Sequence, residues 1–202
     1  MQFDELVLGI DGGGTKTAAW LARRSGSAEA EVIGRGAAGP SNIQTVGAEA
    51  ALQSLDQAVD GAFQDAHMER GRVAAAVLGL AGSDREENQR ILGEWAERRS
   101  VAARFRVVND ALPVLAAGTP DGWGVALISG TGSFAFGQSR DGRTARAGGW
   151  GYLFGDEGSG YAIAVAGLRA AAQAADGRGE KTLLLEAFLR RFDLRQPLDL
   201  IS

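Results

Sequence analysis

Cysteine is absent from the 202 residues of this chain, and histidine occurs only once, at His67. Without thiols the chain can form no disulfide, no thiolate metal site and no cysteine-ligated iron–sulfur cluster. A metal site built from histidine and cysteine, and a catalytic arrangement with a cysteine nucleophile, are excluded by the same counts. His67 lies near the end of an expected helix among charged residues, which favours a solvated surface position.

A basic surface is also missing. The chain has 21 Lys and Arg residues against 25 Asp and Glu residues, which gives a net charge of −4 and a pI of about 5.1. A surface for nucleic acid normally shows itself as a basic patch, so we expect no nucleic-acid partner. Small ligands that are neutral or complexed with Mg²⁺ fit this composition better.

Long apolar runs are absent as well. The run at 162–168 ends at Arg169, far short of the roughly 20 residues that a membrane-spanning helix needs. The first five residues lack the basic start and apolar stretch of a secretion signal. We therefore expect no membrane segment and a cytoplasmic protein.

Glycine, by contrast, is abundant. It accounts for 30 of the 202 residues, about twice its usual share of roughly 7%. The glycines gather at the ends of strand-like runs and do not form low-complexity sequence. A chain of this length can bury a real core and can hold one large domain or two small ones.

Two apolar runs end in near-matching turns of glycine and threonine, LVLGIDGGGTKT at 6–17 and VALISGTGS at 125–133. Each predicts a strand, a tight hairpin and a return strand, in which backbone N–H groups and a hydroxyl can surround an anion. Neither turn has the G-x-x-x-x-G-K-[ST] spacing or opens a helix, which disfavours a P-loop and a Rossmann site. An ordinary hairpin is the alternative for one turn alone, but the pair suggests a nucleotide clamped between two domains.

The first turn carries groups suited to a phosphate. Glycine at 12–14 permits positive φ angles and lets phosphate oxygens approach the backbone closely. Thr15 and Lys16 then supply a hydroxyl and a cation. Asp11, at the end of the strand, can hold the waters around a phosphate-bound Mg²⁺, an ion that keeps several waters and takes few carboxylates.

Asp110 is the candidate general base. It follows the buried-looking run Val107–Val108 and Asn109, at the strand end where open α/β sheets commonly place ligands. The alternative is that Asp110 only caps the helix that follows, a preferred role for aspartate. The sequence leaves both interpretations open.

A second candidate site is the segment GGWGYLFGDEGSG at 148–160, which has six glycines around aromatic residues and the acidic pair Asp156 and Glu157. Carboxylates beside exposed backbone amides would suit the hydroxyls of a polyol. The alternative is a flexible loop whose Asp156 caps the next helix. The polar turn GPSN at 39–42 is likewise either an ordinary loop or a ligand contact.

The periodicity of apolar residues predicts an α/β fold. Strands are expected near 5–11, 16–23, 30–37, 73–79 and 104–108, and helices at 47–67, after Ser83 and at 110–117. Ser83 and Glu86 have the spacing of a capping box. The pattern then restarts, with strands at 123–129, 133–139 and 143–148 and helices at 157–175 and 181–192. Hairpin-connected strands followed by strand–helix alternation indicate a mixed sheet with flanking helices, and we divide the chain into domains at 1–117 and 118–202.

In this order, the motifs IDGGGTKT, GPSN, VVNDA, LISGTGS and GGWGYLFGDEGSGY resemble the BadF/BadG/BcrA/BcrD ATPase family. They are most similar to the N-acetylglucosamine and glucosamine kinases within it. The resemblance covers essentially the whole chain, and the last motif is the most specific. It implies the actin-like, ribonuclease H-like ATPase fold of two related domains, with ATP and an amino sugar in the cleft between them.

The resemblance also implies roles for single residues. It implies nucleotide contacts at Gly13, Gly14, Thr15 and Lys16 and at Gly130, Thr131, Gly132 and Ser133. It implies that Asp11 holds Mg²⁺ and that Asp110 takes the proton from the sugar hydroxyl that attacks the γ-phosphate. Amino-sugar contacts are implied at Asn42, Asp110, Gly149, Gly151 and Asp156, with Glu157 of the same acidic pair as a further candidate. The mechanism would be in-line phosphoryl transfer in a cleft that closes to exclude water.

Members of the family continue beyond the helix at 181–192 with an adenosine-binding motif and the rest of the second domain, whereas this chain stops at Ser202. We therefore expect a fragment of a kinase with an incomplete second domain. A non-catalytic module that binds sugar or nucleotide is the main alternative, and the presence of Asp110 and Asp156 favours the kinase.

Two other classes are disfavoured. Activator ATPases of the radical-dehydratase type belong to the same family but hold an iron–sulfur cluster with cysteines. A transcriptional sugar sensor would need a DNA-binding element, and the first strand starts near Glu5, which leaves no room for an N-terminal helix-turn-helix. The identity of the sugar and the oligomeric state, a homodimer included, are left open.

Overall fold

The computed structural model describes residues 5–26 and 30–201. The chain divides into two compact units, one formed by Met1–Ala126 with Gln138–Arg143 and the other by Leu127–Gly137 with Thr144–Ser202. This division falls inside a strand, and the domain assignment at 1–117 and 118–202 stays a prediction.

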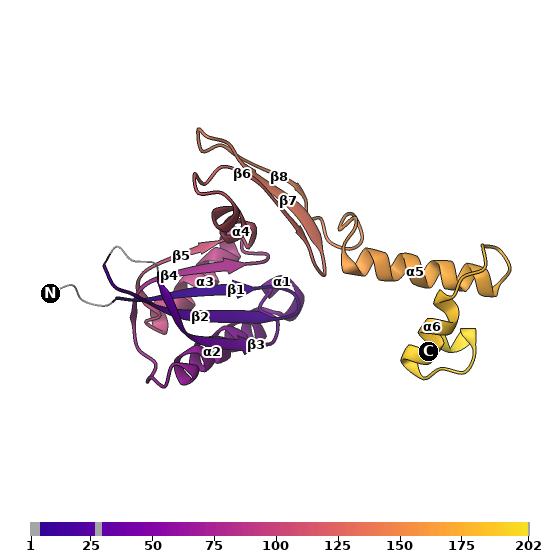
Figure 1. Cartoon of the computed structure of the whole chain (residues 1–202), viewed down its shortest axis with the longest axis horizontal. Coiled ribbons are helices and arrows are strands. Elements are labelled where there is room, and N and C mark those ends of the chain that lie inside the picture. The colour runs from indigo at the N-terminus through magenta and orange to yellow at the C-terminus, as the bar shows by residue number, and fades with distance from the viewer. Residues whose placement is uncertain (1–4, 27–29, 202) are drawn as a thin grey trace. The chain divides into compact units, whose positions relative to one another are not determined.

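The first unit is built on a five-stranded mixed sheet in the order β3-β2-β1-β4-β5 (Figure 1). Its strands are β1 (Glu5–Gly12), β2 (Thr17–Arg24), β3 (Glu31–Ala38), β4 (Val73–Leu80) and β5 (Ala102–Val108). β1, β2 and β3 pair antiparallel, whereas β4 runs parallel to both β1 and β5. Short hairpins join antiparallel neighbours, and helical crossovers return the chain for parallel ones, so the predicted mixed sheet is confirmed.

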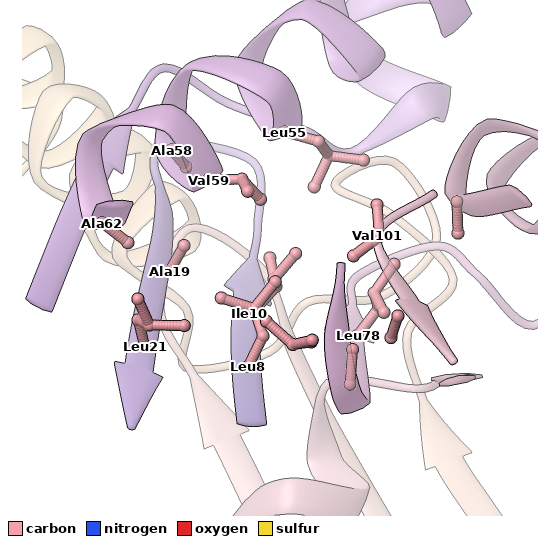
Figure 2. Packing of buried hydrophobic residues seen from close by; sticks show 14 of the residues in the cluster. Leu8, Ile10, Ala19, Leu21, Leu55, Ala58, Val59, Ala62, Leu78 and Val101 are labelled. Atoms are coloured by element: carbon pink, nitrogen blue, oxygen red, sulfur yellow. The ribbon is translucent and has the colours of Figure 1, made fainter. Parts of the chain in front are cut away.

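Two long helices cover one face of this sheet. The helices of the unit are α1 (Ile43–Val46), α2 (Ala48–Asp65), α3 (Glu86–Arg98) and α4 (Ala111–Gly118). Leu55 and Val59 of α2 belong to the same buried cluster as Leu8, Ile10 and Leu21 of the strands (Figure 2). The apolar spacing that predicted a helix at 47–67 therefore marks the face that α2 buries.

Two glycines of β3 let α2 approach the sheet closely. A Cβ on Gly34 would lie 2.1 Å from the carbonyl oxygen of Ala62, and a Cβ on Gly36 would lie 1.9 Å from that of Ala58. Both acceptor atoms belong to the helix backbone and cannot swing aside. The alternation of glycine along β3 therefore fixes the distance between helix and strand.

The capping box predicted for α3 is wrong. Arg85 occupies the N-cap position without a side-chain cap, and Ser83 is buried with its hydroxyl donating to the carbonyl oxygen of Val108 at 3.0 Å. Ser83 therefore ties the end of β4 to the end of β5.

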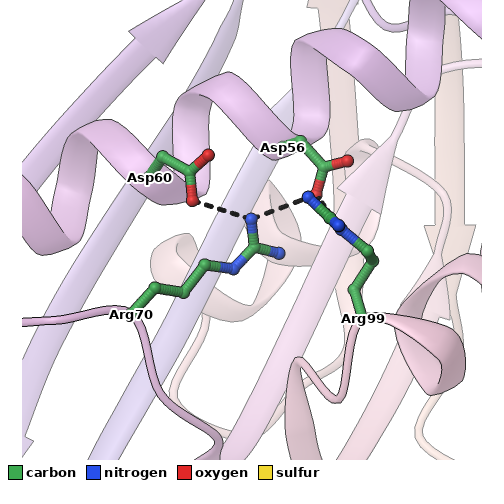
Figure 3. Close-up of polar contacts among 4 residues, drawn as sticks. All are labelled: Asp56, Asp60, Arg70 and Arg99. Carbon is green, nitrogen blue, oxygen red and sulfur yellow. Dashed lines mark hydrogen bonds and ion pairs between the residues drawn. The ribbon is translucent and has the colours of Figure 1, made fainter.

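Ion pairs join α2 to the loops that precede β4 and β5 (Figure 3). Arg70 Nη1 lies 3.1 Å from Asp56 Oδ1 and 2.8 Å from Asp60 Oδ1, and Arg99 Nε lies 2.8 Å from the same Asp56 oxygen. The hydrogen bond and charge of Asp56 hold the pKa of Arg99 above its usual value. The cluster joins three segments that are distant in sequence and lies away from the strand ends that carry the candidate site.

The remaining sheet has three strands in the order β6-β7-β8, namely β6 (Gly124–Ser129), β7 (Ser133–Gln138) and β8 (Thr144–Gly148). They are followed by α5 (Gly160–Ala175), α6 (Leu184–Phe192) and a 3-10 helix at Pro197–Ile201. α5 starts three residues later than predicted, because the Ser159 side chain accepts a hydrogen bond from the amide of Ala162. Within residues 5–26 and 30–201, no helix is long and apolar enough to cross a membrane.

Candidate active site

The ends of three parallel strands form the edge on which the first half of the site is built. The register pairs Asp11 of β1 with Gly79 of β4, and Gly79 with Val108 of β5. The segments that follow therefore leave the sheet side by side: the first glycine turn, residues 81–84, and Asn109 with Asp110. This is the edge at which open α/β sheets bind ligands.

The first turn is tight and open to solvent. The amide of Gly13 donates to the carbonyl oxygen of Lys16 at 3.0 Å. Thr15 and Lys16 are exposed, and a Cβ on Gly14 would meet nothing within 4 Å. The turn thus leaves room for a ligand against its backbone.

None of the glycines at 12–14 uses the positive φ angles that glycine permits. At Gly12 the need for glycine comes from packing. A Cβ there would lie 2.1 Å from Ser41 Oγ and 2.6 Å from Leu80 Cδ2. Glycine at this position lets the 39–42 turn lie directly against the strand end.

The 39–42 turn is held to the first glycine turn by its backbone. The amides of Ser41 and Asn42 both donate to the carbonyl oxygen of Gly13, at 3.0 and 3.2 Å. The Asn42 side chain caps α1 by accepting from the Gln44 amide at 3.0 Å. Asn42, predicted as a sugar contact, therefore lies beside the predicted phosphate turn, and its amide nitrogen Nδ2 is not part of this cap.

Asp110 does not cap the helix that follows it. It occupies the N-cap position of α4, but its side chain makes no cap hydrogen bond. The cap is supplied instead by Asn109, whose Oδ1 accepts from the amide of Ala111 at 2.9 Å. Asp110 Oδ1 is buried and has no hydrogen-bond partner among the residues that the structure describes. The capping interpretation is therefore wrong, and the carboxylate is left available.

Burial, helped by the charges of Asp11 and Asp84 and opposed by the backbone amides of Asp110 and Ala111, raises the pKa of Asp110 to about 6. A carboxylate in this range is ionised at neutral pH and is a stronger base than an ordinary aspartate. Catalytic bases work best with a pKa near the operating pH. The raised pKa is compatible with the role of general base, which stays a prediction.

Asp84 is a residue of this site that sequence reasoning missed. Its Oδ2 accepts from Asn109 Nδ2 at 2.9 Å, so Asp84 orients the residue that caps α4 and adds charge beside Asp110. Its place just after β4, at the same edge as Asp11 and Asp110, is the signal that could have found it. Among the described residues, no three His, Cys, Asp or Glu side chains gather as a metal site. A phosphate-bound Mg²⁺ needs fewer protein ligands than that.

The second glycine turn lies in the second unit, where its last residue is fully engaged. Gly130 donates through its amide to the carbonyl oxygen of Gly132 at 2.9 Å. The Ser133 amide donates to Asp156 Oδ1 at 3.0 Å, and the Ser133 hydroxyl donates to the carbonyl oxygen of Glu157 at 2.8 Å. Gly130 and Thr131 remain exposed at the tip of the turn.

The glycine-rich loop at 148–160 uses the conformations that its composition permits. Four of its glycines have positive φ, with values of 77°, 70°, 81° and 75° at Gly148, Gly149, Gly151 and Gly158. Asp156 itself has φ 61°, which is strained for a residue with a side chain. Because Ser159 caps α5, the interpretation of Asp156 as a helix cap is wrong.

Each unit therefore gathers part of the predicted site. The first brings together Asp11, Gly13, Gly14, Thr15, Lys16, Asn42 and Asp110 around one sheet edge. The second brings together Gly130, Thr131, Gly132, Ser133, Gly149, Asp156 and Glu157. Gly151 lies in the same loop, and among the described residues it makes no backbone hydrogen bond to the second glycine turn. The placement of ATP and sugar between the two groups stays a prediction.

The model of the BadF/BadG/BcrA/BcrD ATPase family matches residues 8–191. The chain belongs to this family. Among its relatives is the N-acetylmuramic acid/N-acetylglucosamine kinase of Clostridium acetobutylicum, with 37% identity over 97% of this chain and 63% of the relative. The N-acetyl-D-glucosamine kinase of Dictyostelium discoideum is 33% identical over 98% of this chain and 64% of the relative. The chain thus spans just under two thirds of the length of these relatives.

Two solved structures share the fold. A Chromobacterium violaceum protein assigned as an N-acetylglucosamine kinase superimposes with a TM-score of 0.74 and 28% identity, covering 92% of this chain and 63% of that one. A Porphyromonas gingivalis protein with the same assignment gives a TM-score of 0.70 and 26% identity, covering 94% and 63%. The predicted α/β, actin-like ATPase fold with a mixed sheet and flanking helices is confirmed.

Proposed function

We propose that this chain takes part in the ATP-dependent phosphorylation of a hydroxyl on an amino sugar, N-acetylglucosamine or glucosamine. The observation that carries the proposal is Asp110, a carboxylate with a buried, unpartnered oxygen and a pKa raised to about 6, at the sheet edge beside the first glycine turn. The kinase names of two relatives that are 37% and 33% identical support the class of substrate.

ATP would be held through its phosphates by the two glycine turns. The Gly13 amide closes the turn by donating to Lys16, Gly14 leaves open space against the backbone, and Thr15 and Lys16 add an exposed hydroxyl and cation. The second turn, at 130–132, would add further phosphate contacts from its exposed tip. Asp11, exposed at the end of β1, would hold the waters of the Mg²⁺ that accompanies ATP, and that ion would neutralise charge on the phosphates. The domains at 1–117 and 118–202 would each contribute one turn.

Asp110 would act as the general base. Its carboxylate accepts the proton of the attacking sugar hydroxyl while the hydroxyl oxygen bonds to the γ-phosphorus and the bond to the bridging oxygen of ADP breaks. The raised pKa strengthens this base without keeping it protonated at neutral pH. Asn109 and Asp84 hold the segment in place and leave the Asp110 carboxylate available.

The sugar would be positioned by residues of both units. Asn42 and Asp110 lie in the first unit, whereas Gly149, Gly151, Asp156 and Glu157 lie on the loop of the second. Carboxylate oxygens and backbone amides of this kind match the alternating donors and acceptors of a sugar. Their arrangement around one sugar is part of the proposal.

The test is release of ADP from Mg²⁺-ATP by the whole chain, measured against a panel of amino sugars and plain hexoses. We expect release that depends on an amino sugar and that is lost in Asp110→Asn. Release that ignores the sugar would indicate a simple ATPase, and sugar binding by calorimetry without any release would indicate a binding module. Either of these results would contradict the proposal.

A further inference from the structure

The second glycine turn and the glycine-rich loop form one hydrogen-bonded body within the second unit. The turn donates from Ser133 N and Oγ to Asp156 and Glu157, and Ser129 Oγ donates to the carbonyl oxygen of Gly158 at 3.0 Å. Two amides of the loop donate in the other direction. The Gly149 amide donates to the carbonyl oxygen of Ser133 at 3.0 Å, and the Gly160 amide donates to the carbonyl oxygen of Gly130 at 2.8 Å. A ligand that orders the loop therefore also orders the turn.

Asp156 is the one side chain of the loop that joins this network through a carboxylate. Its Oδ1 accepts from the Ser133 amide, and both of its oxygens lie 3.0 Å from the position of a Cβ on Gly132. Only a glycine at 132 lets the carboxylate come this close to the turn. The contact is made with Asp156 in the left-handed region, at φ 61°. A strained residue persists where the surrounding contacts hold it, and such residues gather at functional sites.

We propose that Asp156 is a positioning residue for the nucleotide: it holds the second turn in the shape that receives the phosphates of ATP, in addition to contacting the sugar. The inference rests on the proposed function and deepens it. Oδ1 accepts from the Ser133 amide, and in this proposal Oδ2 binds a sugar hydroxyl. One carboxylate thereby links the sugar loop to the phosphate turn, so that the binding of each substrate favours the other.

If Asp156 opposed nucleotide binding, its removal would have the opposite effect on the affinity for ATP. A carboxylate against the turn could instead repel phosphate and engage a backbone amide that ATP needs. Removal of the carboxylate would then tighten nucleotide binding. The two roles are separated by the affinity for nucleotide in the absence of sugar, a quantity that a residue contacting only sugar would not change.

The experiment measures binding of Mg²⁺-ATP to the whole chain by calorimetry without sugar, in Asp156→Ala and Asp156→Asn. We expect Asp156→Ala to bind about tenfold more weakly, since it loses a hydrogen bond from a backbone amide to a charged group. Asp156→Asn should bind within about twofold of the original chain, because its amide oxygen can still accept from Ser133. Asp176→Ala, which removes an exposed carboxylate paired with Arg178 in the same unit, serves as the control.

Hydrogen exchange of the free variants gives a second readout that needs no ligand. The amides at 130–133 should exchange faster in Asp156→Ala than in Asp156→Asn. Equal or tighter binding of Mg²⁺-ATP by Asp156→Ala would overturn the positioning role and leave the proposed function standing. Failure of the original chain to bind Mg²⁺-ATP would instead contradict the proposed function, and this inference with it.

Discussion

At the scale of single residues, the neighbours Asn109 and Asp110 have different roles at the end of β5. Asn109 caps α4 and is held by Asp84, so that Asp110 is free of the structural role its position suggests. The sequence predicted where Asp110 lies but could not decide between base and cap. Both roles place an aspartate at the same position, and only the partner of the Ala111 amide tells them apart.

Asp110→Asn should abolish turnover and stabilise the fold. Because the pKa of Asp110 is about 6 in the fold and near 4 in an unfolded chain, the folded state binds more protons between these values. Folding stability therefore falls as pH rises from about 4 to 6, and the cost is fully present above 6. After a discount for the partial exposure of Asp110, the gain should be about 1 to 2 kcal/mol.

Urea unfolding at pH 7.5 and pH 4 measures this gain, which should vanish at the lower pH. Asp176→Asn, an equal change of charge at an exposed site, should show no comparable gain. Loss of stability in Asp110→Asn at pH 7.5 would contradict the account of its burial.

Asp84→Asn should move the acid limb of the pH–rate profile to lower pH. The charge of Asp84 raises the pKa of Asp110, and its removal favours ionisation of the base. The asparagine oxygen can still accept from Asn109, so the cap of α4 is retained. In the original chain kcat/KM for the sugar should fall below about pH 6. A limb that stays in place or moves to higher pH in Asp84→Asn would show that the two carboxylates are not coupled.

At the scale of elements, hydrophobic periodicity predicted every strand and every long helix. It missed α1, a helix of four residues, and it misplaced the starts of α3 and α5. The start of a helix depends on which side chain accepts a hydrogen bond from a backbone amide of its first turn. The Ser159 hydroxyl accepts one from Ala162 and caps α5, whereas the Ser83 hydroxyl donates to the carbonyl oxygen of Val108 in β5. Local spacing cannot distinguish a cap from a tertiary contact.

Gly36→Ala should destabilise the first unit by about 2 to 3 kcal/mol, because the new Cβ would collide with the backbone of α2. Gly9→Ala is the matched control in the same sheet, since a Cβ there meets nothing within 4 Å. Urea unfolding of both variants checks the prediction. Equal stability of the two would contradict the close packing of α2 on β3.

At the scale of the whole molecule, the hydrophobic core lies in the first unit. All the residues of the buried cluster, from Leu8 to Ala102, belong to it. Among the described residues of the second unit, only Ala171 and Ser159 are buried. The sequence predicted two parts by the recurrence of the strand pattern, but apolar periodicity alone could not show that one part would bury so much less than the other.

This contrast predicts unequal local stability. Amides of β1 and β4, which are paired on both sides within the sheet and carry core residues on one face, should exchange hydrogen far more slowly than amides of α5 and α6. Exchange followed by mass spectrometry on the whole chain measures the difference. Comparable protection of α5 and the central strands would contradict the distribution of the core.

The most direct test of the central claim is transfer of labelled γ-phosphate from Mg²⁺-ATP to N-acetylglucosamine or glucosamine by the original chain and by Asp110→Asn. The account predicts a labelled sugar phosphate from the original chain and none from the variant, which should fold at least as stably. Equal yields from the two chains would remove Asp110 as the base, and release of labelled inorganic phosphate without any sugar phosphate would contradict a kinase.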